Sequence, residues 1–282
     1  PDGARARGVQ DRRLIHRPWD VIRFRDEAIA ADLAATLGDP PARARTTDAR
    51  ALPGVTVLGD AAVRVSASAT VFPGVVLDAT GGPVVVADGA TVRPGAILIG
   101  PVWVGDHSAI LEHALIKANT AVGPWCKIAG EVGGAIVQGH SNKAHDGHLG
   151  DAWIGEWVNL GAGTVNSNLL NTYGEVAAAA APHMPREKTG LTFLGCVLGD
   201  HVKTAIGTRL MTGTVVGTGS MLASTSAPPT AVGRFAWITD AGATRYKLPR
   251  FLDAAERMMK RRGVSLSPAM RECLTALHGD AP

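Results

Sequence analysis

Residues 86 to 128 read VADGATVRPGAILIGPVWVGDHSAILEHALIKANTAVGPWCKI, and this stretch decides the fold. A large aliphatic residue stands at every sixth position without a miss: Val86, Val92, Leu98, Val104, Ile110, Ile116, Val122 and Ile128. Four places after most of them stands a small or compact residue: Ala90, Ala96, Ser108, Ala114, Thr120 and Cys126. A fixed period of six fits neither a helix nor an ordinary strand. It predicts a β-solenoid in which each hexad forms one short strand and one corner.

Strand dimensions give the shape of this solenoid. Five or six residues at about 3.3 Å each form one flat side, and three sides close a triangular coil of about eighteen residues. Coils stacked about 4.8 Å apart satisfy one another's backbone hydrogen bonds. We therefore expect the large aliphatic residues and the small residues to fill the interior.

Composition excludes several classes of protein. The 282 residues are 46% hydrophobic and carry a formal net charge of only +3. Lysine and arginine are scattered along the chain, so nucleic acid is not an expected partner. No apolar run reaches transmembrane length and no secretory signal opens the chain, so no membrane partner is expected. Three cysteines without CxxC spacing indicate a reducing compartment, and the cytoplasm is the expected location.

The hexads divide the chain into three expected parts. Residues 1–50 are expected to hold a solvated tail up to residue 13, a helix from Pro18 and a polar linker. Residues 51–240 carry the solenoid. Residues 241–282 are expected to form helices, the second of which begins with Ser267 as its N-cap.

The repeat fails twice, and chemistry is expected where it fails, because a solenoid filled with aliphatic side chains has no crevice of its own. The first failure, residues 131–150, holds three of the nine histidines of the chain: His140, His145 and His148. Histidine titrates near neutral pH and is suited to take a proton from a nucleophile. The second failure, residues 166–189, includes an alanine run from Ala177 to Ala181 to which the sequence assigns no role.

Three segments carry a resemblance to a known family. They are Gly123-Pro124-Trp125-Cys126-Lys127, the stretch from Ser141 to Gly155, and Asn159-Leu160-Gly161-Ala162-Gly163-Thr164 followed by Asn166-Ser167-Asn168. These segments resemble the acetyltransferase domain of the bifunctional UDP-N-acetylglucosamine pyrophosphorylase/glucosamine-1-phosphate N-acetyltransferases, and are closer still to a divergent GlmU-like branch labelled as sugar nucleotidyltransferases. The resemblance covers residues 14–240. It implies a left-handed parallel β-helix with flanking N- and C-terminal helices, assembled as a homotrimer.

The activity that the resemblance implies is N-acetylation of an amino sugar phosphate by acetyl-CoA. Glucosamine 1-phosphate is the first candidate acceptor, in the biosynthesis of UDP-N-acetylglucosamine or a related nucleotide sugar. His145 falls on the family's general base and Asn168 on the asparagine that places the reactants. His148 stands where the family has an active-site tyrosine, and it is a third expected catalytic residue.

Binding residues follow from the same resemblance. The expected substrate contacts are Lys127, Lys143, Asn142 and Asn166, and the expected contacts of acetyl-CoA are Ala162, Gly163, Thr204 and Arg209. Backbone N–H groups of the corner at Gly161 to Gly163 are expected to stabilise an oxyanion. The family's phosphate-binding cations fall on or near Ala129, Gly133 and Gly134, so other cations must hold a sugar phosphate here.

Two other interpretations remain open. The chain lacks a glycine-rich N-terminal nucleotide-binding segment, so by itself it is not expected to make UDP-sugars. One alternative is a non-catalytic trimeric scaffold for a nucleotidyltransferase domain, fused or separate. Alternatively, His140 and His145 are five residues apart, a spacing that resembles the zinc ligands of β-helical carbonic anhydrases, with His107 or His113 as the third ligand. Acetyl transfer itself requires no tightly bound metal, and none is expected.

Overall fold

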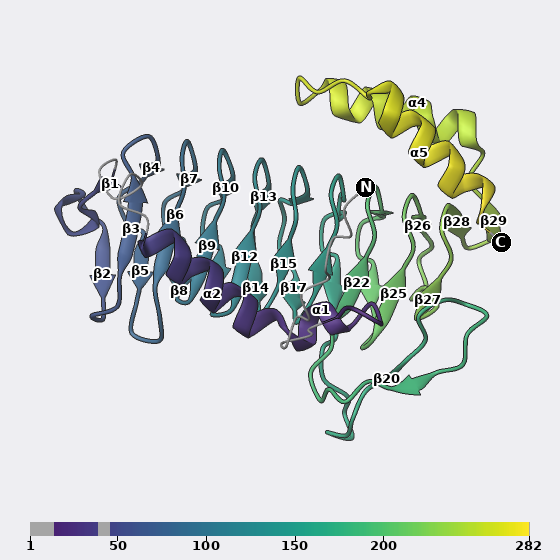
Figure 1. Cartoon of the computed structure of the whole chain (residues 1–282), viewed down its shortest axis with the longest axis horizontal. Coiled ribbons are helices and arrows are strands. Elements are labelled where there is room, and N and C mark those ends of the chain that lie inside the picture. Colours follow the sequence, from purple (N-terminus) through teal and green to yellow (C-terminus); the bar gives the residue numbers. More distant parts are fainter. Residues whose placement is uncertain (1–13, 39–45, 282) are drawn as a thin grey trace, which may run out of the picture.

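The computed structural model, which describes residues 14–38 and 46–281, is a long parallel β-helix with helices along one side and at one end (Figure 1). The fold class predicted from the sequence, a left-handed β-helix of hexapeptide repeats with flanking helices, is confirmed. The predicted tail of residues 1–13 and most of the predicted linker, residues 39–45, lie outside the described residues.

Three sheets, which we call A, B and C, form the sides of the β-helix. Sheet A contains β1 (Thr46–Thr47), β3 (Val63–Ser66), β6 (Val84–Val86), β9 (Val102–Val104), β12 (Thr120–Val122), β15 (Ile136–Val137), β18 (Trp153–Ile154), β22 (Cys196–Leu198), β25 (Thr214–Val216) and β27 (Ala231–Val232). Sheet B contains β2 (Thr56–Leu58), β5 (Val76–Asp78), β8 (Ile97–Ile99), β11 (Leu115–Ile116), β14 (Glu131–Gly133) and β17 (His148–Gly150), and the pair β19 (Val165–Asn166) and β24 (Arg209–Leu210) continues this side.

Sheet C is formed in two blocks. The first block contains β4 (Thr70–Val71), β7 (Thr91–Val92), β10 (Ala109–Ile110), β13 (Lys127–Ile128) and β16 (Asn142–Lys143). The second block contains β23 (Lys203–Thr204), β26 (Met221–Ala223), β28 (Ala236–Thr239) and β29 (Gly242–Arg245). Asn159 bridges the blocks, because it pairs in parallel with Asn142 on one side and with Lys203 on the other.

The residues that fill the interior of the β-helix are those predicted from the hexads. All eight aliphatic residues of the hexads are at most 1% exposed, and so are the small residues that follow them. Where the register resumes, Leu198, Leu210, Val216 and Leu222 are also buried. Thr204 takes an interior position that the period assigns to an aliphatic residue, and its hydroxyl bonds to that of Thr164 at 2.7 Å.

Aromatic rings line one corner of the β-helix. His107, Trp125, His140, Trp157 and His201 all adopt left-handed backbone angles, with φ between 52° and 61°. Their rings stack from coil to coil, with centroid distances of 4.3, 6.4, 4.2 and 6.5 Å. We call this set the His/Trp column. The rings of this column belong to one chain.

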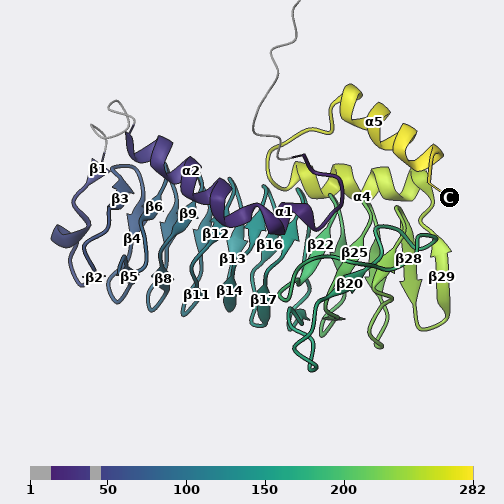
Figure 2. The same ribbon diagram turned by 60° about the horizontal axis from the view of Figure 1, so that its bottom comes forward.

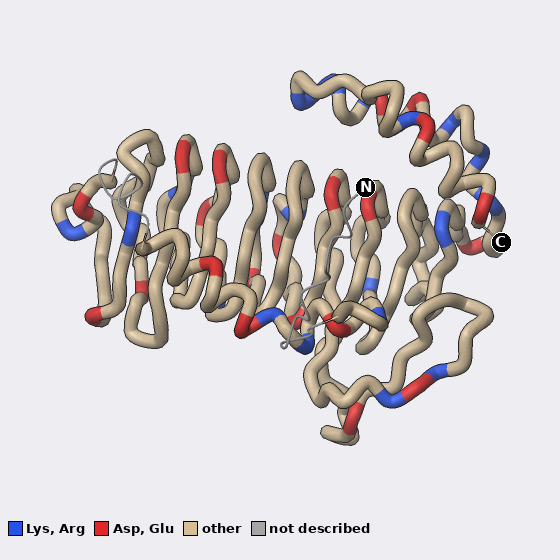
Figure 3. The backbone as a smooth tube through the Cα atoms, viewed as in Figure 1, with Lys and Arg blue, Asp and Glu red and all other residues tan. Residues whose placement is uncertain are grey.

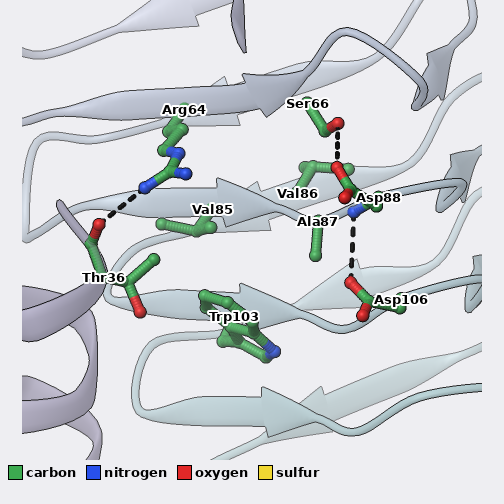
Figure 4. Close-up of a pocket in the computed structure, with 9 residues that line it drawn as sticks. All are labelled: Thr36, Arg64, Ser66, Val85, Val86, Ala87, Asp88, Trp103 and Asp106. Carbon is green, nitrogen blue, oxygen red and sulfur yellow. Dashed lines mark hydrogen bonds between the residues drawn. The ribbon is translucent and has the colours of Figure 1, made fainter. Parts of the chain in front are cut away.

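The N-terminal helices α1 (Asp20–Arg23) and α2 (Arg25–Gly38) run along sheet A (Figure 1). Ile29 and Leu33 of α2 pack on Val85 of β6. Arg64 donates to the carbonyl of Thr36 near the end of α2, at 2.6 Å, beside a shallow pocket whose far end holds Asp88 and Asp106 (Figure 4). The predicted N-terminal helix is therefore present and seated on the solenoid.

Two segments complete the structure. The second failure of the repeat forms a projecting hairpin of β20 (Ala177–Ala178) and β21 (Glu187–Lys188), so part of the alanine run serves as a strand. The C-terminal helices α4 (Leu248–Lys260) and α5 (Pro268–Gly279) pack together and run back along the C-terminal half of the β-helix (Figure 2). Ser267 accepts a hydrogen bond from the Met270 N–H, as an N-cap does.

Candidate active site

His145 lies on the corner between sheets C and B, in the short loop that joins β16 to β17. Its side chain is exposed. Gly147 gives this loop its shape, with φ at +126°. A Cβ at Gly147 would lie 2.3 Å from the carbonyl oxygen of Thr164, so only glycine fits there.

Lys143 anchors this loop from inside. The residue is 4% exposed, and its ammonium donates to the carbonyl of Ala129 at 2.7 Å and to the carbonyl of His145 at 3.1 Å. Burial lowers the pKa of Lys143 to about 8. The sequence predicted Lys143 as a substrate contact; in the structure its charge is directed to the backbone that carries His145.

The backbone of Gly163 differs from that of Gly207, its counterpart in the following coil. In the following coil the Gly207 N–H donates to the carbonyl of Ala162 at 2.7 Å. The register through Asn142 and Asn159 places His145 opposite Ala162, so the same pattern would pair the Gly163 N–H with the His145 carbonyl. That carbonyl instead accepts from Lys143, and within the described chain the N–H groups of Ala162 and Gly163 have no acceptor.

A hollow of about 550 Å³ opens at this corner. It is lined by Leu111, Glu112, Ala129, Ala144, His145, Asp146, Ala162 and Gly163. The structure thus brings together the predicted base and two residues of the predicted oxyanion corner, although they come from different coils. Thr204 stabilises the corner from the interior, because its hydroxyl accepts the Gly161 N–H at 2.9 Å.

A second polar group lies on the outer face of sheet B. His148 pairs in register with Glu131 of the preceding coil, and its Nδ1 is 3.4 Å from a carboxylate oxygen of Glu131. Lys117 forms an ion pair with the same oxygen. A Cβ built on Gly150 would lie 2.5 Å from Nε2 of His148 and 2.7 Å from Nδ2 of Asn168, so these two side chains meet over this glycine.

Asn168 is held from the other side by Asp151. The amide of Asn168 donates to Oδ2 of Asp151 at 2.7 Å, and Oδ1 of Asp151 accepts from Arg25 at 2.6 Å. Two of the three predicted catalytic residues, His148 and Asn168, therefore share one polar group, while His145 lies at the adjacent corner.

Two cationic side chains lie beside Gly133 and Gly134, the positions on which the resemblance places the family's phosphate-binding cations. The side chain of Lys117 lies over Gly133, since a Cβ at Gly133 would be 3.0 Å from Cβ of Lys117. Arg25 donates to the carbonyl of Gly134 at 2.6 Å. Lys117 comes from the preceding coil and Arg25 from α2. The segments that carry the family resemblance include neither residue, so the sequence did not indicate that they lie beside Gly133 and Gly134.

Two further predicted contacts have structural roles. The Asn166 amide is buried; it accepts from the Gly150 N–H at 2.7 Å and donates to the Gly150 carbonyl at 2.8 Å. Thr204 is buried with its hydroxyl satisfied. These hydrogen bonds give both side chains a structural role, and their contact with a ligand stays a prediction. Arg209 is exposed on β24, opposite Val165.

Lys127 and Asn142 lie at the start of sheet C strands, at the opposite end of the strands from His145. Both line a second hollow, of about 450 Å³, beneath the end of α4. Arg262 donates to Oδ1 of Asn142 at 2.6 Å. The sequence predicted Lys127 and Asn142 as substrate contacts, and it did not indicate that the C-terminal helices lie beside them.

The histidines of the zinc interpretation are separated within the chain. His107 and His140 belong to the His/Trp column and stack against Trp125, whereas His145 lies beyond β16. Residues 14–38 and 46–281 contain no group of three His, Cys, Asp or Glu side chains arranged to hold a metal ion. In the same described ranges, no helix is long and apolar enough to cross a membrane.

Comparison with known proteins adds sequence relatives. No family model matches the chain. A bifunctional protein GlmU from Cyanothece sp. is 26% identical over 226 residues, which are 72% of this chain and 45% of that protein. A bifunctional protein GlmU from Nocardia farcinica is 31% identical over 183 residues, which are 58% of this chain and 32% of that protein. The chain therefore spans less than half the length of these curated relatives.

Among solved structures, a hexapeptide transferase family protein from Anaplasma phagocytophilum matches with a TM-score of 0.40 and 14% identity, covering 81% of this chain and 98% of that one. The chain is therefore similar in sequence to GlmU proteins over part of their length, and it folds as a parallel β-helix of hexapeptide repeats.

Proposed function

We propose that the protein is an acyltransferase that moves the acetyl group of acetyl-CoA to the amino group of a sugar phosphate, with glucosamine 1-phosphate as the first acceptor to test. One observation carries this proposal. His145, Ala162 and Gly163 line the same hollow, and the N–H groups of Ala162 and Gly163 have no acceptor among the described residues. A general base and an oxyanion site within one hollow are what amide formation from a thioester requires.

The reaction follows from these positions. The amine nitrogen of the acceptor attacks the thioester carbonyl carbon while His145 takes a proton from that nitrogen. Negative charge builds on the carbonyl oxygen, and the Ala162 and Gly163 N–H groups donate hydrogen bonds to it. The C–S bond then breaks, the thiolate of coenzyme A leaves, and the imidazolium of His145 returns the proton to sulfur. The products are the N-acetyl sugar phosphate and free coenzyme A.

The acceptor is assigned to the outer face of sheet B. His148 and Asn168 present an imidazole and an amide there, suited to sugar hydroxyl groups. Lys117 and Arg25 supply positive charge beside Gly133 and Gly134, where the resemblance led us to expect phosphate-binding residues. Each cation also pairs with a carboxylate, so the phosphate would share it with Glu131 or Asp151.

Assembly and location are part of the proposal. We propose a homotrimer in the cytoplasm, working with a nucleotidyltransferase domain that is fused or separate. An open hollow of about 550 Å³ at a corner would gain a second wall from a neighbouring copy. Cys126 and Cys196 are buried free thiols, which suits a reducing compartment.

The test is release of coenzyme A thiol from acetyl-CoA in the presence of glucosamine 1-phosphate. His145→Ala is expected to lower kcat by about a hundredfold to ten-thousandfold, the usual contribution of a general base. His183→Ala is the matched control, because His183 is exposed on the segment between β20 and β21. Equal turnover by wild type and His145→Ala would refute the assignment of the base, and no turnover by wild type would favour the scaffold.

A further inference from the structure

Two carboxylates flank the polar group on the outer face of sheet B. Glu131 lies beside His148, and Asp151 lies beside Asn168. In the proposed reaction His148 and Asn168 contact the acceptor, whereas neither carboxylate has a role. An ionised carboxylate can only accept hydrogen bonds, so each one restricts how its neighbour presents donors and acceptors.

Both carboxylates are held in place by cations. Lys117 forms an ion pair with Glu131, and its hydrogen bond lowers the pKa of that carboxyl. Arg25 donates to Oδ1 of Asp151 at 2.6 Å, and its side chain is only 11% exposed. Figure 3 shows basic and acidic positions side by side at the start of α2, which Arg25 opens. Each carboxylate is therefore fixed by a cation on one side and faces its polar neighbour on the other.

Glu131 determines which ring nitrogen of His148 carries the proton. Nδ1 of His148 lies 3.4 Å from a carboxylate oxygen of Glu131. In a neutral imidazole one nitrogen donates and the other accepts, and the hydrogen bond of one nitrogen fixes the role of the other. Since the carboxylate can only accept, Nδ1 carries the proton. Nε2 is then an acceptor, and it has no hydrogen-bond partner within residues 14–38 and 46–281.

Asp151 fixes the amide of Asn168 in the same way. Nδ2 of Asn168 donates to Oδ2 of Asp151 at 2.7 Å. The amide cannot turn its oxygen to this carboxylate, because two acceptors would then face each other. Oδ1 of Asn168 is therefore directed away from Asp151, and among the described residues it accepts no hydrogen bond.

The two acceptor groups meet over Gly150. A Cβ at Gly150 would lie 2.5 Å from Nε2 of His148 and 2.7 Å from Nδ2 of Asn168, so the glycine keeps this part of the sheet open. Two acceptors side by side match two hydroxyl groups on neighbouring carbons of a sugar ring, each of which donates one hydrogen bond. An ether, ester or carbonyl oxygen cannot donate to them.

We propose that Glu131 and Asp151 are positioning residues, which make this site select an acceptor with two neighbouring free hydroxyl groups. The inference rests on the function proposed above and narrows its acceptor to amino sugars in which such a pair is free. In a pyranose with a 2-amino group and a 1-phosphate, the pair is the hydroxyl groups at C3 and C4. Neither carboxylate touches the reacting atoms, since each acts through the side chain that it holds.

The first experiment measures the tautomer of His148 and needs no turnover. Long-range proton–nitrogen NMR spectra of histidine-labelled protein distinguish a protonated Nδ1 from a protonated Nε2, and a His148→Gln variant assigns the signal. With His148 neutral, wild type should carry the proton on Nδ1. Glu131→Met should shift it toward Nε2, because the acceptor that holds the proton on Nδ1 is lost. A proton on Nε2 in wild type, or the same tautomer in Glu131→Met, would overturn the role of Glu131.

The control for this variant is Glu256→Met. Glu256 pairs with Arg271 in the C-terminal helices, away from sheet B, and its side chain is 57% exposed. This variant should keep the wild-type tautomer and the wild-type turnover.

The second experiment compares glucosamine 1-phosphate with its 3-deoxy and 4-deoxy analogues. In wild type, kcat/KM should be lower for each analogue by about tenfold or more, because an acceptor in the site is left unpaired. Glu131→Met should remove one of these two losses and Asp151→Asn the other. Asparagine suits position 151, where φ is 45°, and its amide no longer forces the orientation of Asn168.

The outcomes separate this inference from the proposed function. Equal kcat/KM for the three acceptors in wild type, or both losses unchanged in both variants, would overturn the selection of a hydroxyl pair while leaving acyl transfer intact. If wild type acetylates none of them, the proposed function fails. Calorimetric titration with the same three compounds then decides the inference: weaker binding of both deoxy analogues supports it, and equal or absent binding overturns it.

Discussion

The ammonium of Lys143 donates to the main-chain carbonyl of His145 at 3.1 Å, whereas the equivalent carbonyl of the following coil, that of Ala162, accepts from the Gly207 N–H at 2.7 Å. The residue before the loop thus fixes the backbone of the proposed base. Gly163, which lines the same hollow as His145, has no acceptor for its N–H among the described residues. One buried charge therefore affects both elements of the proposed chemistry.

Replacing this charge should separate activity from folding. In Lys143→Met the carbonyl of His145 becomes free to pair with the Gly163 N–H, and one oxyanion donor is lost. We expect kcat to fall on the order of a hundredfold. The melting temperature should stay equal or rise, because an apolar side chain of similar volume replaces a buried ammonium.

Lys188→Met is the matched control for this variant, because the side chain of Lys188 is 83% exposed on the projecting hairpin. It should leave both kcat and the melting temperature unchanged. Full activity in Lys143→Met would show that the Gly163 N–H has no part in the reaction.

Gly150 tests the polar group on sheet B. In Gly150→Ala the new Cβ would lie 2.5 Å from Nε2 of His148 and 2.7 Å from Nδ2 of Asn168, so both side-chain ends must move. We expect kcat/KM for glucosamine 1-phosphate to fall on the order of a hundredfold, as displacements of about 1 Å at reacting groups do. Steady-state kinetics with the acceptor varied measures this loss.

The control is Gly174→Ala, whose Cβ would meet only a side-chain oxygen of Thr172 at 3.7 Å. It should match wild type. A fall in activity for Gly150→Ala that accompanies a lower melting temperature in circular dichroism would indicate loss of fold instead of displacement of His148 and Asn168.

The sequence predicted the interior residues of the repeating hexads, and it did not predict the roles of residues at which the repeat changes. The period of six identified the interior from Val86 to Ile128, because each hexad makes the same contacts as its neighbours. The resemblance added His145, His148 and Asn168, and the structure groups the last two. The interior roles of Thr204 and Asn166 were not visible, because a polar residue within a hexad can point into the coil or out of it.

Sequence motifs did not predict the contacts between segments that are far apart in the chain. Arg25 meets Gly134 across 109 positions, and Arg262 meets Asn142 across 120. Both arginines belong to the helical ends of the chain, where the sequence indicated helices but not the coil on which each one sits. Their positions follow from how α2 and α4 pack on the β-helix, which no spacing rule encodes.

Arg25 gives a prediction about the acceptor. In Arg25→Met the cation beside Gly134 is lost, so kcat/KM for glucosamine 1-phosphate should fall about tenfold. Turnover of free glucosamine, which lacks the phosphate, should change little. The ratio of the two kcat/KM values is the measurement, and Arg25→Lys should retain part of the preference.

Arg271→Met is the control, since it removes a surface ion pair with Glu256 in the C-terminal helices. An equal loss for both acceptors in Arg25→Met would show that Arg25 acts through Asp151 and Asn168 rather than on the phosphate.

The pH dependence of stability gives a last prediction, on Lys143. Burial lowers the pKa of its ammonium from 10.5 to about 8, although Asp146 and Glu131 act to raise it. Between these two values the unfolded chain binds more protons than the folded one, so the free energy of unfolding rises with pH. Below about pH 8 both states hold the proton, and the cost of burying the charge is constant. In Lys143→Met this contribution is absent. Urea titration should therefore show that the free energy of unfolding of wild type rises relative to that of Lys143→Met between about pH 8 and pH 10.5.

Lys188→Met is the control, and the difference between its free energy of unfolding and that of wild type should stay constant across this window. A constant difference between wild type and Lys143→Met would mean that the ammonium of Lys143 is not buried in solution.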